Sequence, residues 1–169
     1  MASEFELIAR YFTPAAPGPG AGVPLGVGDD CALLAPRPGQ QLAVSVDTSV
    51  AEVHFPVAAP AEAIGHRALA VSLSDLAAMG AESRWCLMAL SLERNDDAWL
   101  AAFAHGFHAL CATTGTALIG GDVSRGELAV SVTVMGEVSP EAALTRGGGQ
   151  AGDILAVTGA LGGGAGGLA

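Results

Sequence analysis

Apolar and polar positions along this chain follow two periods, one typical of helices and one typical of strands. Apolar residues recur at helical spacing over residues 4–12, 60–79 and 96–115. Short apolar runs typical of strands cover residues 41–47, 85–92, 117–122 and 127–138. Because strands alternate with helices along the chain, the pattern predicts an α+β or α/β fold.

The helical signals are clearest over residues 96–115. Asp96 or Asp97 can cap the start of this helix, and Gly115 can end it. Its apolar stripe consists of Trp99, Phe103, Phe107 and Leu110. The preceding strand, residues 85–92, is apolar enough that we expect it to be buried on both faces.

Proline and glycine mark the candidate boundaries. Residues 13–24 form a linker rich in both residues, and Ser139 with Pro140 follows the last strong strand. We therefore expect a first domain over residues 1–138 and the start of an incomplete second domain over residues 139–169. Within the second part, ILAVTG (154–159) is predicted to be a strand that has no partner in this chain.

The balance of charged residues excludes more classes of function than the length of the chain does. The chain has 169 residues, of which 51% are hydrophobic, so it can form a core. It has 17 acidic residues and seven arginines, and the net charge of -10 argues against a surface that binds nucleic acid. It has no lysine, which excludes a P-loop lysine. If the protein handles phosphate, divalent cations must screen the repulsion. No targeting segment and no apolar run of membrane-spanning length is found, so we expect a cytoplasmic protein.

Several other chemistries find little support in the sequence. GGGAGG (162–167) satisfies the glycine pattern of a dinucleotide-binding turn, but no helix or later acidic residue follows it. The GxSxG pattern is missing, and no Cys and His can be placed together. We expect the three cysteines to be buried thiols and three histidines to be structural. These are Cys31, Cys86 and Cys111, and His66, His105 and His108.

Four aspartates follow small residues beside apolar elements and are the main candidates for chemistry. They are Asp30, Asp47, Asp75 and Asp122. Each alone also fits a turn or a strand end, although Asp75 lies in a mainly apolar helix, where an unpaired carboxylate is costly to bury. Together, in a chain without lysine, they favour a hard-cation site, with Mg²⁺ held by carboxylates and substrate phosphates.

Two cationic side chains are weaker candidates for phosphate binding. His54 follows the strand that contains Asp47, and Arg146 lies beside three glycines that would let it move over a phosphate chain. Both residues also fit loops without a specific role.

Six segments, in their order and spacing, closely resemble the N-terminal half of the thiamine-monophosphate kinase family. They are EFELIARYF (4–12), GVGDDCALL (26–34), SVDTSVAEVHF (45–55), ALAVSLSDLAAMGA (68–81), LIGGDVSRG (118–126) and ALTRGGGQAGD (143–153). The resemblance implies an α+β fold of α/β sandwich-like form. This is the N-terminal ATP-binding domain of the aminoimidazole ribonucleotide synthetase-like superfamily, with a mixed sheet, flanking helices and a barrel-like interface in a homodimer.

The resemblance also implies an activity and its residues. The activity is ATP-dependent phosphorylation of thiamine monophosphate to thiamine diphosphate, with direct transfer of the γ-phosphoryl group. Several Mg²⁺ ions would be held by Asp30, Ser45, Asp47, Asp75 and Asp122. Gly121, Asp122 and Arg146 would contact ATP, and His54 would contact the thiamine phosphate. Position 46 is often threonine in the family, so a metal contact of Val46 could come only from its backbone carbonyl.

Two other functions stay open on the sequence. One is another ATP-using enzyme of the same superfamily, and the other is a non-catalytic module for nucleotide binding or dimerisation. The acidic motifs of the family's second half do not occur in these 169 residues. We therefore expect this chain alone to bind metal and nucleotide incompletely and to turn over poorly.

Overall fold

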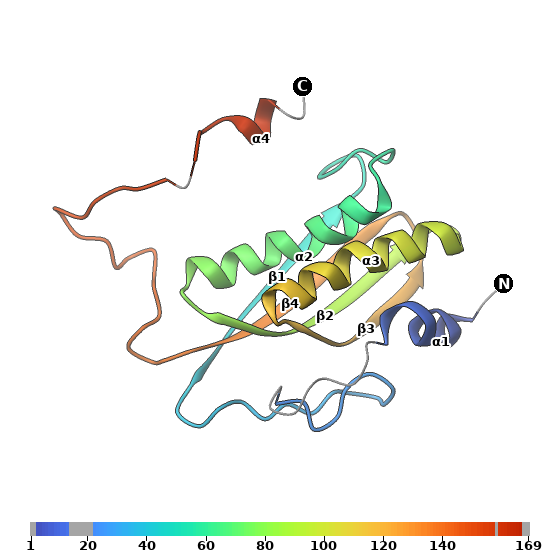
Figure 1. Cartoon of the computed structure of the whole chain (residues 1–169), viewed down its shortest axis with the longest axis horizontal. Coiled ribbons are helices and arrows are strands. Elements are labelled where there is room, and N and C mark those ends of the chain that lie inside the picture. Colours follow the sequence, from blue (N-terminus) through green and yellow to red (C-terminus); the bar gives the residue numbers. More distant parts are fainter. Residues whose placement is uncertain (1–2, 14–21, 158, 167–169) are drawn as a thin grey trace.

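The fold is a four-stranded mixed sheet with two long helices against one face (Figure 1). The computed structural model describes residues 3–13, 22–157 and 159–166; most of the expected 13–24 linker lies outside them. The strands are β1 (Gln41–Val50), β2 (Glu82–Leu92), β3 (Ala117–Arg125) and β4 (Ala129–Val138), in the order β1-β4-β2-β3. Only β2 and β3 pair in parallel. The predicted α+β class is confirmed, and β1, β2 and β3 all run in the same direction.

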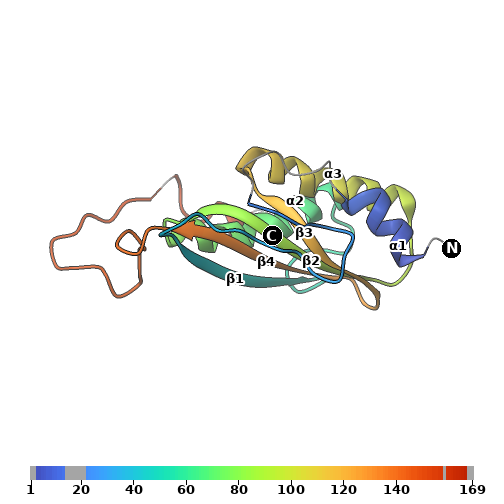
Figure 2. The ribbon, with the colours of Figure 1, turned by 90° about the horizontal axis from the view of Figure 1, so that it is seen from below.

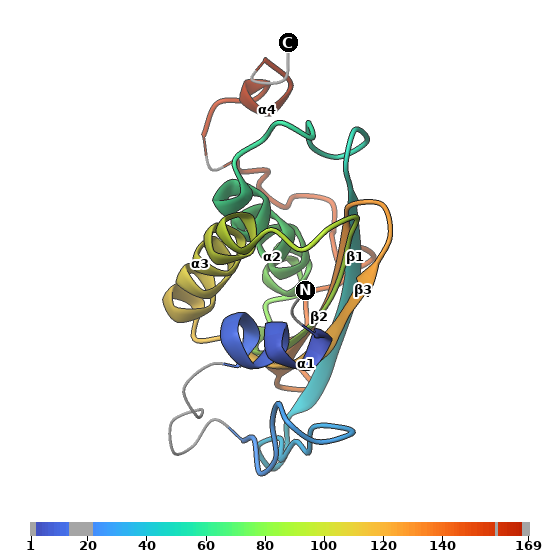
Figure 3. The same ribbon diagram turned by 90° about the vertical axis from the view of Figure 1, so that its right-hand side faces the viewer.

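Helices α2 (Ala61–Ala78) and α3 (Asp97–Thr114) lie side by side on the sheet (Figure 3). Glycines allow their backbones to approach closely. A Cβ atom at Gly65 would lie 2.1 Å from the Phe103 carbonyl oxygen, and one at Gly106 would lie 2.0 Å from that of Glu62. Any larger residue at either position would force the helices apart.

The predicted ends of α3 are confirmed. The Asp96 side chain accepts hydrogen bonds from the backbone N–H groups of Ala98 and Trp99, at 3.0 and 3.1 Å. Gly115 ends the helix with a φ of 69°, a left-handed conformation that glycine adopts without strain.

The core lies between the helices and β2, β4 and β3. Leu90, Phe103 and Phe107 are fully buried there, whereas Trp85, also fully buried, lies outside this cluster and close to Gly22. Strand β2 is not buried on both faces as predicted, because Ala89 is exposed on the face that carries no helix layer.

The N-terminal helix begins as predicted but changes form. It consists of an α-helical turn, α1 (Glu4–Leu7), followed by a π-helical turn over Ile8–Phe12. Ser3 and Glu6 cap its start reciprocally: the Ser3 N–H donates to Glu6 Oε2 at 2.7 Å, and the Glu6 N–H donates to Ser3 Oγ at 3.3 Å. The helical spacing of Phe5, Ile8 and Phe12 predicts one shared apolar face, which is only partly formed because Phe12 is buried whereas Phe5 is 81% exposed.

A charged cluster fixes residues 22–40 to the sheet. The Glu137 side chain is buried and accepts two hydrogen bonds from Arg37, from its backbone N–H at 2.7 Å and from Nε at 2.5 Å. Arg37 also donates from Nη2 to Glu82 at 2.6 Å, and this bond lowers the pKa of the Glu82 carboxyl. The cluster holds the segment that carries Asp29 and Asp30 against the strands.

The face of β1 opposite the helices is apolar and open. Leu42, Val44 and Val46 alternate along it and are 47%, 61% and 61% exposed. In the part of the chain that the structure describes, no helix or strand covers this face (Figures 2 and 3).

Beyond β4 the chain leaves the sheet (Figure 1). The strand predicted over residues 154–159 is wrong: residues 154–157 and 159 form none, and Ile154 and Leu155 are 92% and 99% exposed because no neighbouring strand pairs with them. The glycine-rich stretch contains the short α4 (Gly163–Gly166). Among the described helices, none has the length and apolarity needed to cross a membrane.

Candidate functional site: a cavity beside strand β3

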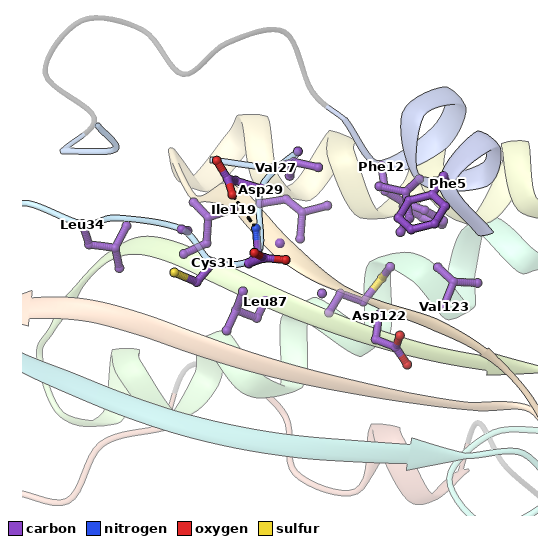
Figure 4. Close-up of a pocket in the computed structure, with 18 of the residues that line it drawn as sticks. Phe5, Phe12, Val27, Asp29, Cys31, Leu34, Leu87, Ile119, Asp122 and Val123 are labelled. Atoms are coloured by element: carbon purple, nitrogen blue, oxygen red, sulfur yellow. Dashed lines mark hydrogen bonds between the residues drawn. The ribbon is translucent and has the colours of Figure 1, made fainter. Parts of the chain in front are cut away.

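A cavity of about 790 Å³ lies between the N-terminal helix, the 27–34 segment and strands β2 and β3 (Figure 4). Asp30, Gly121 and Asp122, all candidates from the sequence, line it. Leu87 and Met88, which are neighbours on β2 and so point to opposite faces of the sheet, both contribute to the lining. The cavity therefore reaches around the edge strand β3.

Strand packing accounts for the two glycines before Asp122. A Cβ atom at Gly121 would lie 1.8 Å from the Met88 carbonyl oxygen, and the φ of Gly121 is 152°. At Gly120, a Cβ atom would meet Leu87 at 3.2 Å. The β3 ladder also contains one extra residue, Ile119, at a register shift opposite Cys86 and Leu87. These features bring the β3 backbone close to β2 and leave Asp122 exposed.

The position of Asp122 differs from the predicted end of a strand. It lies inside β3, opposite Ala89, and the strand continues for three residues to Arg125. Asp30 lies in the facing segment, where its N–H donates to Asp29 Oδ1 at 2.9 Å (Figure 4). Both carboxylates are exposed.

Ser45 and Asp75 form a second candidate group. Ser45 Oγ on β1 donates to Asp75 Oδ2 on α2 at 2.5 Å, and Asp47 follows Ser45 on the same face of β1. Asp75 is exposed, so the expected cost of burying a carboxylate does not arise. Val46 lies between the two, faces the open side of the sheet and is paired with Thr133 in the ladder.

The structure does not gather the five proposed metal ligands at one point. Within the described residues, no three His, Cys, Asp or Glu side chains are close enough together to hold a metal ion. The donors are nevertheless all oxygen atoms, and Mg²⁺ is commonly bound by one or two carboxylates, with waters and substrate phosphates completing its coordination. The pairs Ser45 with Asp75, and Asp30 with Asp122, fit that chemistry only as partial sites.

His54 is exposed in the turn after β1, outside the cavity. The Val50 N–H donates to His54 Nδ1 at 3.1 Å. Since Nδ1 accepts, the neutral ring carries its proton on Nε2 and can donate outward. Arg146 is exposed beyond β4 and does not line the cavity.

Two predictions about the cysteines are wrong: Cys31 is not a buried thiol, and one Cys and one His do lie together. Cys31 is exposed and lines the cavity, because its segment crosses the sheet edge. Cys111 contacts both Cys86 and His108, and the hydrogen bond from Cys86, together with the weaker effect of His108, lowers the pKa of Cys111 to about 6. His108 Nε2 also contacts the Tyr11 carbonyl oxygen at 2.9 Å. The i, i+3 spacing of His108 and Cys111 on one helix could have indicated this pair.

The apolar lining was also missed. The N-terminal helix contributes Phe5, Ile8 and Phe12 to the cavity wall, and the 27–34 segment contributes Val27 and Leu34 (Figure 4). The helical spacing of Phe5, Ile8 and Phe12 predicts that they share one face, but it does not show what that face contacts. The site thus combines an apolar wall with three carboxylates, those of Asp29, Asp30 and Asp122.

The fold and this cavity define the class of protein. The chain belongs to the AIR synthase related family: residues 28–138 match the family described as AIR synthase related protein, N-terminal domain. Over 167 residues it is 47% identical to the thiamine-monophosphate kinase of Escherichia coli strain K12, a match that covers 98% of this chain and 51% of the relative. The chain spans about half the length of the curated relatives it matches.

Solved structures of thiamine-monophosphate kinases are similar in fold to this chain. The thiamine-monophosphate kinase from Stenotrophomonas maltophilia K279a matches with a TM-score of 0.71 and 53% identity, covering 74% of this chain and 40% of that one. AaThiL complexed with AMPPCP and TMP matches with a TM-score of 0.59 and 28% identity, covering 62% and 35%.

Proposed function

We propose that this chain provides the ATP- and metal-binding part of a thiamine-monophosphate kinase. The activity is transfer of the γ-phosphoryl group of ATP to thiamine monophosphate, giving thiamine diphosphate. The observation that carries the proposal is the cavity in which Asp30, Gly121 and Asp122 converge, within the residues that match the family. The similarity of the chain to a structure that holds AMPPCP and TMP supports these substrates.

The proposed roles follow the geometry of the two partial sites. Asp30 and Asp122 would hold Mg²⁺ in the cavity, and Ser45, Asp47 and Asp75 would hold it at the second group, with Val46 contributing at most its backbone carbonyl. Bound Mg²⁺ would neutralise phosphate charge and orient the phosphates. The apolar wall of Phe5 and Phe12 suits a nucleotide base beside those phosphates.

His54 and Arg146 would act on the phosphates directly. The outward Nε2–H of His54 can donate to the phosphate of thiamine monophosphate, and Arg146 can reach ATP from its segment beyond β4. No general base is required, because the attacking group is already an anionic phosphate oxygen. The protein's own contribution is to bring two mutually repelling phosphates into line.

The homodimer and the domain division are parts of the same proposal. The apolar open face of β1, with Val44 and Val46, supports pairing with the same face of a second copy, as in a barrel-like interface. Residues 1–138 would be the binding and dimerisation domain and residues 139–169 the start of the next. We propose a cytoplasmic location.

A non-catalytic module for nucleotide binding or dimerisation is the second candidate. The observation in its favour is that the described residues assemble no complete metal site. Another ATP-using enzyme of the superfamily is distinguished by its acceptor, so thiamine monophosphate should be compared with other phosphate acceptors.

The direct test replaces carboxylates in a protein of the relatives' full length that contains this chain. Asp75→Asn and Asp122→Asn should each lower turnover by orders of magnitude, because they remove charge that faces the phosphates, while the melting temperature stays close to that of the parent protein. Asp97→Asn is the matched control, since Asp97 pairs with Arg10 on the surface, outside the site. Near-normal turnover in both site variants, measured as thiamine diphosphate formed, would remove the metal assignment.

A further inference from the structure

A second, smaller pocket lies where the parallel strands β2 and β3 end. Its volume is about 250 Å³. Leu92 and Arg125 are the last residues of the two strands and lie opposite each other, and the Gly126 N–H extends the ladder by donating to the Leu92 carbonyl at 3.2 Å. The two chains therefore leave the sheet side by side. In open α/β sheets, ligands bind at this carboxyl end of parallel strands.

The pocket has an apolar floor and a polar rim. Leu7, Leu92 and Val123 form the floor and are 2%, 6% and 8% exposed. Arg94, Ser124 and Arg125, which are exposed, supply polar residues of the lining. An apolar floor keeps water from one side of the charges and so strengthens their attraction for a ligand.

No carboxylate neutralises the two arginines at this pocket in the part of the chain that the structure describes. Arg10, Arg37 and Arg84 form ion pairs. Within the described residues, neither Arg94 nor Arg125 makes an ion pair or a side-chain hydrogen bond, although Glu93 also lines the pocket. Two unpaired guanidinium groups at one pocket favour a multiply charged anion between them.

We propose that Arg94 and Arg125, with Ser124, form a binding site for a terminal phosphate dianion at the carboxyl end of β2 and β3. Each guanidinium can donate two parallel hydrogen bonds to phosphate oxygens, and the Ser124 hydroxyl can donate another. The site is distinct from the Asp30 and Asp122 cavity, because the two pockets share only Val123 in their linings.

The direction of the strands connects this site to the proposed reaction. Because β1 runs in the same direction as β2 and β3, the turn that carries His54 lies at the same end of the sheet as Arg94 and Arg125, although β1 and β3 are its two opposite edge strands. The inference deepens the proposed function and rests on it only for the source of the phosphate, which is either thiamine monophosphate or ATP.

The test titrates inorganic phosphate into the 169-residue chain without Mg²⁺ and follows the backbone amides by NMR. Saturable shifts are expected at Ser124, Arg125 and Gly126. The double variant Arg94→Gln, Arg125→Gln should bind phosphate at least about tenfold more weakly, since charge-assisted hydrogen bonds are lost. Arg10→Gln is the control: it removes one positive charge outside the pocket and should bind like the parent.

Equal weakening in the double variant and in Arg10→Gln would overturn the proposal, as would phosphate shifts confined to the Asp30 and Asp122 cavity. Thiamine monophosphate and metal-free ATP are then titrated in turn. The one that shifts the same amides as inorganic phosphate is the source of the phosphate. Metal-dependent ATP binding is measured separately on Asp122→Asn. Failure of the arginine site is thus distinguishable from failure of the proposed kinase function.

Discussion

Gly121 shows how one residue can serve packing and a site together. Its missing side chain is first a requirement of the sheet, because the Met88 carbonyl oxygen occupies the space that a Cβ would need. A bare backbone next to Asp122 is the consequence, and it leaves the carboxylate open to a ligand. The GGD motif is therefore informative even though its glycines have a structural cause.

Cys31 provides a prediction at the same scale. It is exposed at the cavity, whereas Cys86 and Cys111 are buried. We expect one thiol of the folded chain to react rapidly with a soluble aromatic disulfide reagent and all three to react after unfolding, because access limits the reaction.

Cys31→Ser should abolish the rapid phase and leave the slow one. Rapid reaction of two or three thiols in the folded chain would show that the helix layer over Cys86 and Cys111 opens easily, contrary to the burial described above.

At the scale of elements, the close crossing of α2 and α3 depends on Gly65 and Gly106. Gly106→Ala should lower the free energy of unfolding by about 2 kcal/mol or more, because the added methyl collides with the Glu62 backbone and the helices must separate. Denaturant unfolding followed by circular dichroism measures this.

The matched control for the crossing is Gly147→Ala. Gly147 has open space around its Cβ position and no positive φ, so its replacement should leave stability nearly unchanged. Similar stability of the two variants would mean that the helices can shift without cost.

Elements with strong local signals were predictable. The ends of α3 follow from Asp96 and Gly115, which act through hydrogen bonds and φ values that depend on a few neighbouring residues. The strand expected over 154–159 failed because strand formation needs a partner, which a local apolar run cannot supply.

The site was predictable only in part for the same reason. Asp30, Gly121 and Asp122 carried a sequence signal and do line one cavity. The apolar wall formed by Phe5 and Phe12 depends on how the N-terminal helix packs. The hydrogen bond between Ser45 and Asp75 depends on how α2 packs against β1. Neither relation is encoded in spacing along the chain.

At the scale of the whole molecule, the open face of β1 predicts self-association. The 16.7 kDa chain should sediment as a dimer, and the double variant Val44→Asp, Val46→Asp should sediment as a monomer, because charges would enter an apolar interface. Val57→Asp, at a residue that is 63% exposed outside this face, is the control. A monomeric parent protein at micromolar concentration would contradict the interface.

The central claim is that this chain binds ATP through metal ions held by its carboxylates. Calorimetry of the 169-residue chain with ATP, once with Mg²⁺ and once with a chelator, tests it most directly. The account predicts saturable binding with Mg²⁺ that is lost with the chelator and strongly weakened in Asp122→Asn. Absence of ATP binding in the presence of Mg²⁺, or equal binding without it, would contradict the claim.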